Sequence, residues 1–402
     1  MSRLPSALQP AWPLFKRVHR LLSFVLGLVF RRTSRLAGQR ALPHRATLRA
    51  ADTAALEPDA VVLHPAGPGE ELVRTMPVGT PADHWVFQDE LTYDVPARFC
   101  LEIENGTTVG DYAAIVTPGG TLDYETSGYF GISSWREHPL FLRPQLPPIE
   151  KVDGTLLNLT TRGSSANYYH FLLDVLPRYG IFREALPDRW PDAVYVPHTS
   201  RYQKQLLAMT GIDQLPLLPA GGGTALRADR LLVPSTPNQE LAAPTWVVDW
   251  LRRNLPASAA SDLPTKLYVT RGDAPNTRRY VEEPELWPLL ERQGFARVDP
   301  GTLTVQEQID VFAAADVVVA PHGAALSNLV FCKPGVRILE LFAANYVNHC
   351  YWTIACAVPG TTYQYLVADG SHRTGRPMTG VLTDIRIPAS QVLAALDDLL
   401  SR

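Results

Sequence analysis

Two stretches in the C-terminal third of the sequence combine arginine, glycine and histidine at short spacing. Arg271, Arg278 and Arg279 lie close together, and the forked guanidinium group matches the oxygens of a phosphate. Farther along, the run Pro321-His-Gly-Ala-Ala-Leu-Ser-Asn328 has a glycine turn that leads into a helix start, where backbone amides and the helix dipole attract anions. Glu340 follows as a carboxylate that could accept hydrogen bonds from ribose hydroxyls. Together these features favour a nucleotide phosphate site, with candidate binding residues Arg271, Arg278, Arg279, His322, Gly323, Ala324, Ala325, Asn328 and Glu340.

A second constellation is the stretch Asn167-Tyr-Tyr-His-Phe-Leu-Leu-Asp-Val-Leu-Pro-Arg178. His170 and Asp174 are four residues apart, so both lie on one face of a helix. Such a pair can fix the tautomer of the imidazole while its other nitrogen takes a proton. A purely structural hydrogen bond in a buried helix is the competing interpretation. The remaining candidates for substrate contact in this stretch are Asn167, Tyr169 and Arg178.

The elements that must position the C-terminal group alternate regularly. We predict strands at 267–270, 295–298, 316–320 and 336–341, with helices at 283–293, 304–315 and 324–330 between them. This order is typical of a doubly wound parallel sheet, in which ligands bind at the carboxyl ends of the strands. The candidate residues follow three of the predicted strands, so we expect them to lie at one edge of the sheet.

The preceding part of the chain is less regular. Strands are predicted at 156–160, 193–196 and 230–233, with helices at 167–176 and 201–210, and Pro177 is expected to kink or stop the first helix. The proline-rich stretch 234–265 indicates a domain boundary. The sequence therefore predicts three parts, namely a basic leader at 1–55, an N-terminal acceptor-side α/β domain at 56–255, and a C-terminal nucleotide-sugar-binding Rossmann-like domain at 256–402.

In this order, the His170 stretch, the Arg271 loop and the run from Asp316 to Asn328 with Ile338-Leu-Glu-Leu-Phe342 resemble glycosyltransferase family 61. The resemblance covers about residues 150–365, and Ser327 stands where the family often has threonine. Bacterial members are often described as capsular polysaccharide biosynthesis proteins. The resemblance implies an α/β fold of two Rossmann-like domains facing a central cleft (the GT-B type). It also implies inverting transfer of a sugar from a UDP-sugar donor to a glycan acceptor in surface or capsular polysaccharide synthesis, without an essential metal.

The sequence supports a metal-free mechanism independently of the family resemblance. The sequence contains no Asp-x-Asp motif to hold a diphosphate-bound cation, so leaving-group charge would be met by the arginines and by the helix start at Gly323–Ala325. We expect no metal site, and no cofactor besides the nucleotide-sugar cosubstrate. His170 is the expected general base and Asp174 its orienting partner, and the alternative assigns the base to Asp174.

Two other functions fit parts of the pattern. A non-catalytic nucleotide- or sugar-binding scaffold protein of the same fold would keep the phosphate residues, but it would have no use for the His170–Asp174 pair. An epimerase acting on a nucleotide-sugar is the second rival, and the predicted two-domain division disfavours it.

Charge is distributed unevenly along the chain. The 402 residues carry a net charge of −3, which argues against a nucleic-acid partner, whereas residues 1–50 hold ten basic residues and no acidic one. Within them, Leu21–Phe30 is apolar but too short to cross a bilayer, which needs about twenty residues. This leader could be an interfacial helix on an anionic leaflet, a disordered basic segment or an organelle transit peptide.

Four cysteines form no Cys-x-x-Cys pair and fit no zinc template, which suits a reduced compartment. We therefore expect a cytoplasmic protein. Residues 1–50 are its candidate contact with the inner face of the cell membrane.

Overall fold

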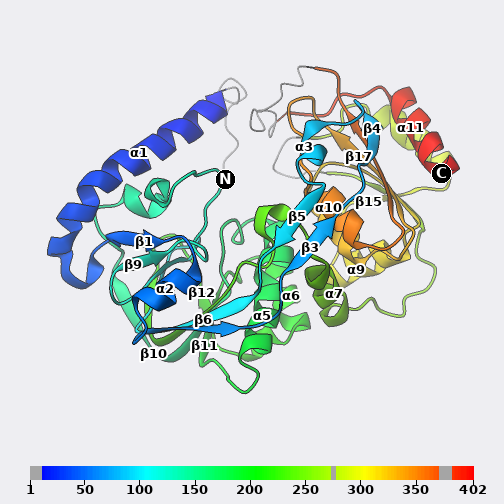
Figure 1. Ribbon diagram of the computed structural model, residues 1–402. Helices are drawn as coiled ribbons and strands as arrows, with labels where there is room; N and C mark the ends of the chain where they lie inside the picture. Colours follow the sequence, from blue (N-terminus) through cyan, green and yellow to red (C-terminus); the bar gives the residue numbers. More distant parts are fainter. Residues whose placement is uncertain (1–10, 273–277, 371–382) are drawn as a thin grey trace. The chain divides into compact units, whose positions relative to one another are not determined.

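The computed structural model describes residues 11–272, 278–370 and 383–402, and it is a mixed α/β structure built around parallel strands (Figure 1). The chain divides into two compact units. We call the first the N-terminal unit, comprising Leu14–Glu70 and Pro96–Asn238. The second is the C-terminal unit, whose described residues are 11–13, Glu71–Val95, 239–272, 278–370 and 383–402.

One ten-stranded sheet organises the N-terminal unit. Its strands are β1 (Arg45–Thr47), β2 (Val61–Pro65), β6 (Phe99–Glu104), β7 (Thr107–Val109), β8 (Ala114–Val116), β9 (Thr121–Asp123), β10 (Ile149–Asn158), β11 (Ala193–Val196), β12 (Leu217–Pro219) and β13 (Ala225–Pro234). Its α-helices are α1 (Trp12–Thr33), α2 (Ala50–Leu56), α4 (Tyr168–His170), α5 (Leu176–Ala185) and α6 (Arg201–Met209). A π-helical turn, η5 (Phe171–Val175), joins α4 to α5, and short 3₁₀ helices are η2 (Ser34–Arg40), η3 (Trp135–Glu137), η4 (Pro139–Leu142) and η6 (Ile212–Gln214).

The parallel part of this sheet has the strand order β13-β10-β11-β12. The chain runs from β10 outward through β11 and β12, and it then returns to the other side of β10 as β13. Strand order therefore reverses between β10 and β13, and such a switch point is where doubly wound sheets bind ligands. On its far side, β13 pairs antiparallel with β6 and β7, so the sheet is mixed.

The C-terminal unit contains a six-stranded sheet in the order β15-β14-β16-β17-β18-β4, and every pairing is parallel. Its strands are β4 (Val78–Thr80), β14 (Lys266–Val269), β15 (Ala296–Val298), β16 (Val317–Pro321), β17 (Arg337–Phe342) and β18 (Thr362–Val367), and β3 (Glu70–Val73) and β5 (Thr92–Val95) form a separate pair. The helices are α3 (Trp85–Gln88), η7 (Gln239–Leu241), α7 (Thr245–Asn254), α8 (Glu283–Arg292), α9 (Val305–Ala314), η8 (Ala324–Phe331), α10 (Cys350–Ala357) and α11 (Ala389–Ser401). Strand order reverses here between β14 and β16.

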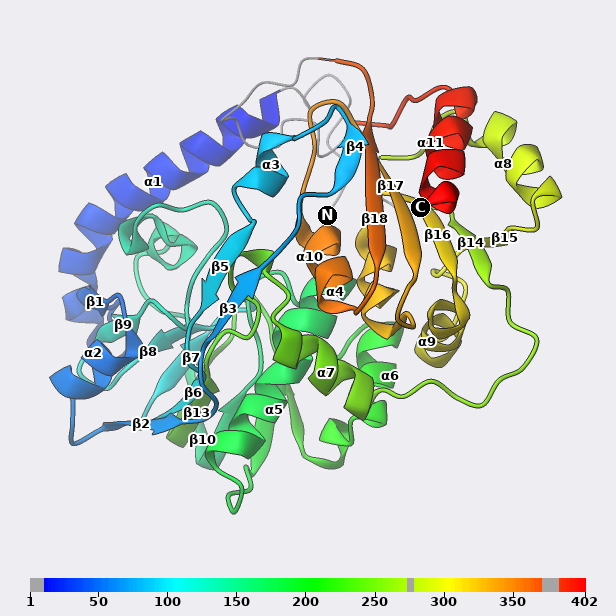
Figure 2. The same cartoon turned by 45° about the vertical axis from the view of Figure 1, so that its right-hand side comes forward.

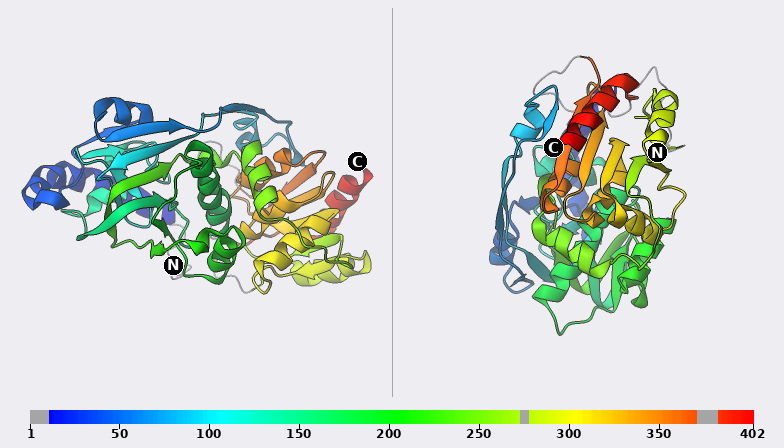
Figure 3. Two further views of the ribbon diagram at one scale, coloured as in Figure 1. Left: turned by 90° about the horizontal axis from the view of Figure 1, so that it is seen from below. Right: turned by 90° about the vertical axis from the view of Figure 1, so that its right-hand side faces the viewer.

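Helices cover both faces of this second sheet (Figures 2 and 3). Alternate residues of β16, Val317 and Val319, belong to a core that also contains Leu286 of α8 and Val392 of α11. The intervening Val318 is equally buried, and α10, which contacts η8, packs on the neighbouring strand β18. Burial on both faces explains why the strand reads as an uninterrupted apolar run.

Most predicted strands and helices after residue 150 are confirmed to within a few residues, with one clear correction. Pro177 does not stop a helix, since helical structure continues through α5 to Ala185. Of the two predicted alternatives, a kink or a stop, only the stop is excluded: the proline comes directly after the π turn, where the regular α-helical hydrogen bonding is already interrupted.

The division into units also differs from the predicted boundaries. The two units separate between Asn238 and Gln239, whereas the sequence analysis placed the boundary at 255/256. Residues Glu71–Val95 belong to the C-terminal unit because β4 pairs with β18 at the edge of its sheet. Gly79 permits this pairing: a Cβ there would lie 2.3 Å from the Tyr365 ring.

The leader is helical from Trp12 to Thr33. Among the residues that the structure describes, no helix has the length and apolar character needed to span a membrane.

Candidate functional site

The His170–Asp174 pair lies beyond the carboxyl end of β10, beside the switch point of the N-terminal unit. His170 Nδ1 is 2.7 Å from Asp174 Oδ2, and both side chains are largely buried. The π turn begins directly after His170, so the backbone geometry changes at this residue. Gly163, with φ of 77°, lets the preceding loop pass close to the imidazole, because a Cβ there would lie 2.7 Å from His170 Cδ2.

Asn238 completes this group from the segment that follows β13. Its Nδ2 donates to Asp174 Oδ1 at 2.9 Å and to the Tyr169 hydroxyl at 3.0 Å. Asp174 thus has one oxygen toward the imidazole and the other held by a buried amide. In this geometry Asp174 Oδ2 can accept the Nδ1–H of His170, and that tautomer has Nε2 as its basic nitrogen.

The other residues predicted in this stretch have local roles. Asn167 caps α4, since its side chain accepts from the Tyr169 amide at 3.0 Å. Arg178 is fully buried, and it donates to the carbonyls of Thr160 (2.6 Å) and Pro234 (2.5 and 3.0 Å). The predicted substrate contact of Arg178 is therefore corrected: the guanidinium ties the end of β13 to the residues after β10. Burial lowers its pKa to about 10, which still leaves it charged at neutral pH.

In the C-terminal unit, Arg271 and His322 meet at the switch point between β14 and β16. Arg271 Nη1 donates to the His322 carbonyl at 3.0 Å, and Gly323 leaves room for this contact, because a Cβ there would lie 2.0 Å from the same nitrogen. Burial, followed by the nearby charge of Arg278, lowers the pKa of Arg271 to about 10, so it remains a cation. Its Nε is buried with no hydrogen-bond partner among the residues that the structure describes.

Glu340 is placed differently from the prediction. It is fully buried, with Oε1 at 2.5 Å from His322 Nδ1 and Oε2 bonded to the Tyr363 hydroxyl, so it cannot serve as the expected ribose acceptor. Burial raises the pKa of Glu340 well above its usual value. Burial and then the charges of Arg278 and Arg271 hold the pKa of His322 well below its usual value, so the imidazole is neutral.

Arg278 and Arg279 follow the undescribed residues 273–277. The Arg278 guanidinium stacks on the Tyr346 ring at 4.8 Å, and that ring contacts His322. Arg279 is exposed, and its backbone amide donates to Asp384 at 3.0 Å.

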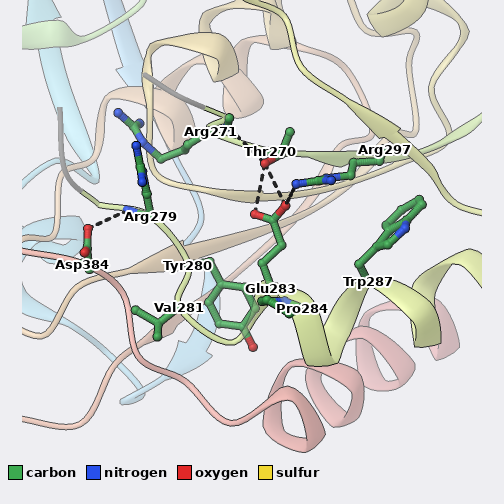
Figure 4. A pocket seen from close by; sticks show the side chains of 11 residues that line it. Thr270, Arg271, Arg279, Tyr280, Val281, Glu283, Pro284, Trp287, Arg297 and Asp384 are labelled. Atoms are coloured by element: carbon green, nitrogen blue, oxygen red, sulfur yellow. Dashed lines mark hydrogen bonds and ion pairs between the residues drawn. The ribbon is translucent and has the colours of Figure 1, made fainter. Parts of the chain in front are cut away.

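A pocket of about 640 Å³ opens beside Arg271, between the ends of β14 and β15 and helix α8 (Figure 4). Arg271 and Arg279 both line it, as does Trp287 of α8. Glu283 of α8 accepts from the Thr270 hydroxyl at 2.9 Å and pairs with Arg297, so its negative charge is compensated inside the pocket (Figure 4). The volume suits a nucleotide-sized ligand.

The helix start predicted at Gly323–Ala325 is present as η8, a 3₁₀ helix, with Ala324 and Ala325 partly exposed. Its first amides have no partner within the helix, as at any helix start. The predicted substrate contact of Asn328 is corrected. Its side chain is fully buried and donates to Gln308 Oε1 and to the Ala325 carbonyl, each at 3.0 Å. Asn328 therefore connects η8 to α9 and does not face a ligand.

Sequence reasoning missed Asn238 and Tyr363. Asn238 was treated as part of the proline-rich boundary, although its position just after a predicted strand at 230–233 is the signal that singled out the other candidates. Tyr363 gave no such signal, since it lies near the start of β18 and reaches Glu340 only across the sheet.

Each α/β unit has polar side chains near a point where the strand order of its sheet reverses, and doubly wound sheets bind their ligands at such points. Residues 168–339 match the family model described as Glycosyltransferase 61. The resemblance found in the sequence is therefore confirmed: the chain carries a segment that matches glycosyltransferase family 61, and this match supports glycosyltransferase activity. The match includes His170, Asp174, Arg271 and His322.

Other comparisons add little. No curated protein matches the chain. One similar solved structure shares 11% sequence identity with this chain. It is described as dodecameric iron-containing heptosyltransferase TibC in complex with ADP-D-beta-D-heptose. The likeness covers 85% of this chain and 93% of that chain, with a TM-score of 0.33, which is too low to carry an argument.

Proposed function

We propose that the protein is an inverting, metal-independent glycosyltransferase that moves a sugar from a nucleotide-sugar, with UDP as the nucleotide, to a glycan hydroxyl in surface or capsular polysaccharide synthesis. The observation that carries this proposal is that the family-matched segment 168–339 contains both strand-end groups, the His170–Asp174 pair and the Arg271–His322 contact. The two units would act as the paired domains of a GT-B enzyme, one supplying the base and the other holding the donor.

The donor diphosphate is best matched by the C-terminal group. Arg271 is a largely buried cation whose Nε has no hydrogen-bond partner within the described part of the chain, and Arg278 adds a second positive charge beside it. A neutral His322 paired to a protonated Glu340 carries its hydrogen on Nε2, which is a donor for a phosphate oxygen. With the amides at the start of η8, these groups would meet the charge that develops on the leaving nucleotide.

Acceptor activation is assigned to His170. The acceptor oxygen attacks the anomeric carbon as the bond from that carbon to the diphosphate oxygen breaks. Nε2 takes the hydroxyl proton, and the electron pair of the broken bond leaves with the nucleoside diphosphate. Asp174, held by Asn238, orients the imidazole and stabilises its charged form.

A donor screen followed by a transfer assay tests the proposal. Thermal shifts with UDP-, GDP- and CMP-sugars identify the donor, because a ligand that binds the folded state raises the melting temperature. We expect a UDP-sugar to give the largest shift, and its release as UDP to depend on a glycan acceptor. Release of UDP should continue in EDTA; activity lost in EDTA and restored by Mn²⁺ or Mg²⁺ would refute metal independence.

UDP-sugar consumption without an acceptor would favour the epimerase. Donor binding without turnover for any glycan offered would favour the scaffold protein.

A further inference from the structure

Helix α1 is a long helix (Figures 1 and 2), and most of its apolar residues are exposed. Leu14, Val18, Leu21, Val25 and Leu28 recur at spacings of three and four, so they form one stripe along the helix. Each of these side chains is more than two-fifths exposed, and Leu21 is 62% exposed. The large exposed apolar residues of this helix are Leu14, Phe15, Val18, Leu21, Leu22, Phe24, Val25, Leu28 and Val29.

The opposite side of α1 packs on the N-terminal unit through small and charged residues. Ser23 and Gly27 are buried, and a Cβ on Gly27 would lie 3.0 Å from Phe141. Arg20 pairs with Glu137 at 2.9 Å, and the Arg31 guanidinium lies 4.8 Å from the Trp135 ring centroid. The orientation of the helix is therefore fixed by specific contacts, and the stripe faces away from the unit that holds it.

The basic residues around this stripe indicate what kind of surface would cover it. Arg17, Arg32 and Arg35 are exposed around it, and the first fifty residues contain no acidic residue. A second copy of the chain docking stripe to stripe would bring these like charges together. An anionic lipid surface instead satisfies both features, since apolar side chains enter the interface while arginines remain among the headgroups.

We propose that α1 docks the protein onto anionic phospholipid bilayers, lying in the plane of the membrane with the stripe Leu14–Val18–Leu21–Val25–Leu28 inserted. This inference is independent of the proposed sugar transfer. The helix carries too much charge to cross the bilayer, and its contacts with Glu137 and Trp135 hold the rest of the N-terminal unit against the surface.

Vesicle co-sedimentation of the full chain tests this proposal, with vesicles of phosphatidylcholine alone and with about a third phosphatidylglycerol. We expect binding to the anionic vesicles that weakens with salt. Leu21→Gln/Val25→Gln should reduce this binding at least tenfold. Arg17→Gln/Arg32→Gln should remove most of the preference for anionic vesicles, since each basic residue near such a surface strengthens binding about fivefold.

The matched control is Val62→Gln/Val73→Gln, which changes two exposed valines on β2 and β3 and should bind as the unmodified protein does. Circular dichroism must show the same helix content and melting temperature in every variant compared. Equal vesicle binding by the Leu21/Val25 variant and the unmodified protein would overturn the proposal. So would a concentration-dependent dimer in sedimentation velocity that this variant abolishes, because the stripe would then bind a second copy.

Discussion

Replacing Asp174 with asparagine tests the proposed base most directly, because Asn238 restricts how the new amide can be oriented. In the structure, Asn238 Nδ2 donates to one oxygen of Asp174 and His170 Nδ1 lies against the other. While Asn238 keeps its present orientation, the oxygen of the introduced amide faces Asn238 Nδ2, so its NH₂ faces Nδ1. The imidazole then accepts at Nδ1 and carries its hydrogen on Nε2, where it can no longer take a proton.

The size of the expected loss of turnover follows from the cost of the alternative orientation of the introduced amide. Turning the amide over would set two NH₂ groups against each other in a buried site, and a buried unsatisfied donor costs about 1–3 kcal/mol. The productive tautomer would then be about 5- to 150-fold less populated. Loss of the negative charge beside the imidazolium adds to this, so we expect turnover in Asp174→Asn to fall about 10²- to 10³-fold, with affinity for UDP unchanged.

A second substitution should reverse this effect. In Asp174→Asn/Asn238→Asp, the carboxylate at position 238 accepts from the NH₂ of the amide at position 174, whose oxygen can then accept Nδ1–H. The Tyr169 hydroxyl, which now accepts from Asn238, can donate to the new carboxylate instead. We expect the double variant to regain at least tenfold in turnover over Asp174→Asn, measured as acceptor-dependent release of UDP. Asn238→Asp alone is the control, and it should be slower than the unmodified protein.

A double variant as inactive as Asp174→Asn would refute the tautomer argument. If Asp174→Asn also lost more turnover than His170→Ala, the base would be Asp174.

The remaining predictions concern donor binding, the fold and acid stability. Arg271→Ala and Arg278→Ala should each weaken UDP binding by about 1.5–3 kcal/mol in calorimetry, which is the value of a hydrogen bond to a charged group. The control Arg253→Ala, on the exposed side of α7, should leave the affinity for UDP unchanged. Unchanged affinity in both the Arg271 and the Arg278 variant would remove this loop from the site. Arg178→Met should lower the free energy of unfolding by about 3 kcal/mol or more, since it leaves two carbonyl groups without their charged donor. The folded variant should keep its affinity for UDP. A stable but inactive variant would instead show that Arg178 contacts the substrate. Burial lowers the pKa of His138 to about 4, below its unfolded value of about 6.5. The contribution of the neutral His138 to stability is therefore complete above pH 6.5 and is lost as the pH falls toward 4. The free energy of unfolding should fall by about 3 kcal/mol over this range. Hydrogen exchange in the segment 127–146 should accelerate over that range, and His138→Asn, which can still cap the Leu140 amide, should flatten the dependence; an equal acid slope in this variant would assign the effect to another group.

The sequence by itself determined the parallel architecture of the C-terminal unit and much of its ligand edge. Apolar runs such as Val317–Ala320, the Thr304–Glu307 capping box and the glycine stop after α8 are local signals, and parallel strands bring their carboxyl ends to one edge whatever the details of packing. The same local logic placed His170 and Asp174 on one face of a helix, because a spacing of four needs no tertiary information.

Only the tertiary structure decided what each polar side chain faces. Arg178, Asn328 and Glu340 have types that suit a ligand, yet each is fully buried and bonded to groups brought together by the fold. The partners of Asp174 and Glu340 come from Asn238 and Tyr363, 64 and 23 residues away in sequence. Composition also revealed that the leader is basic and apolar, but only its packing through Ser23 and Gly27 determined that the apolar stripe faces outward. Burial and pairing depend on which strands are neighbours and which helix side packs, and those are properties of the whole sheet that local spacing does not encode.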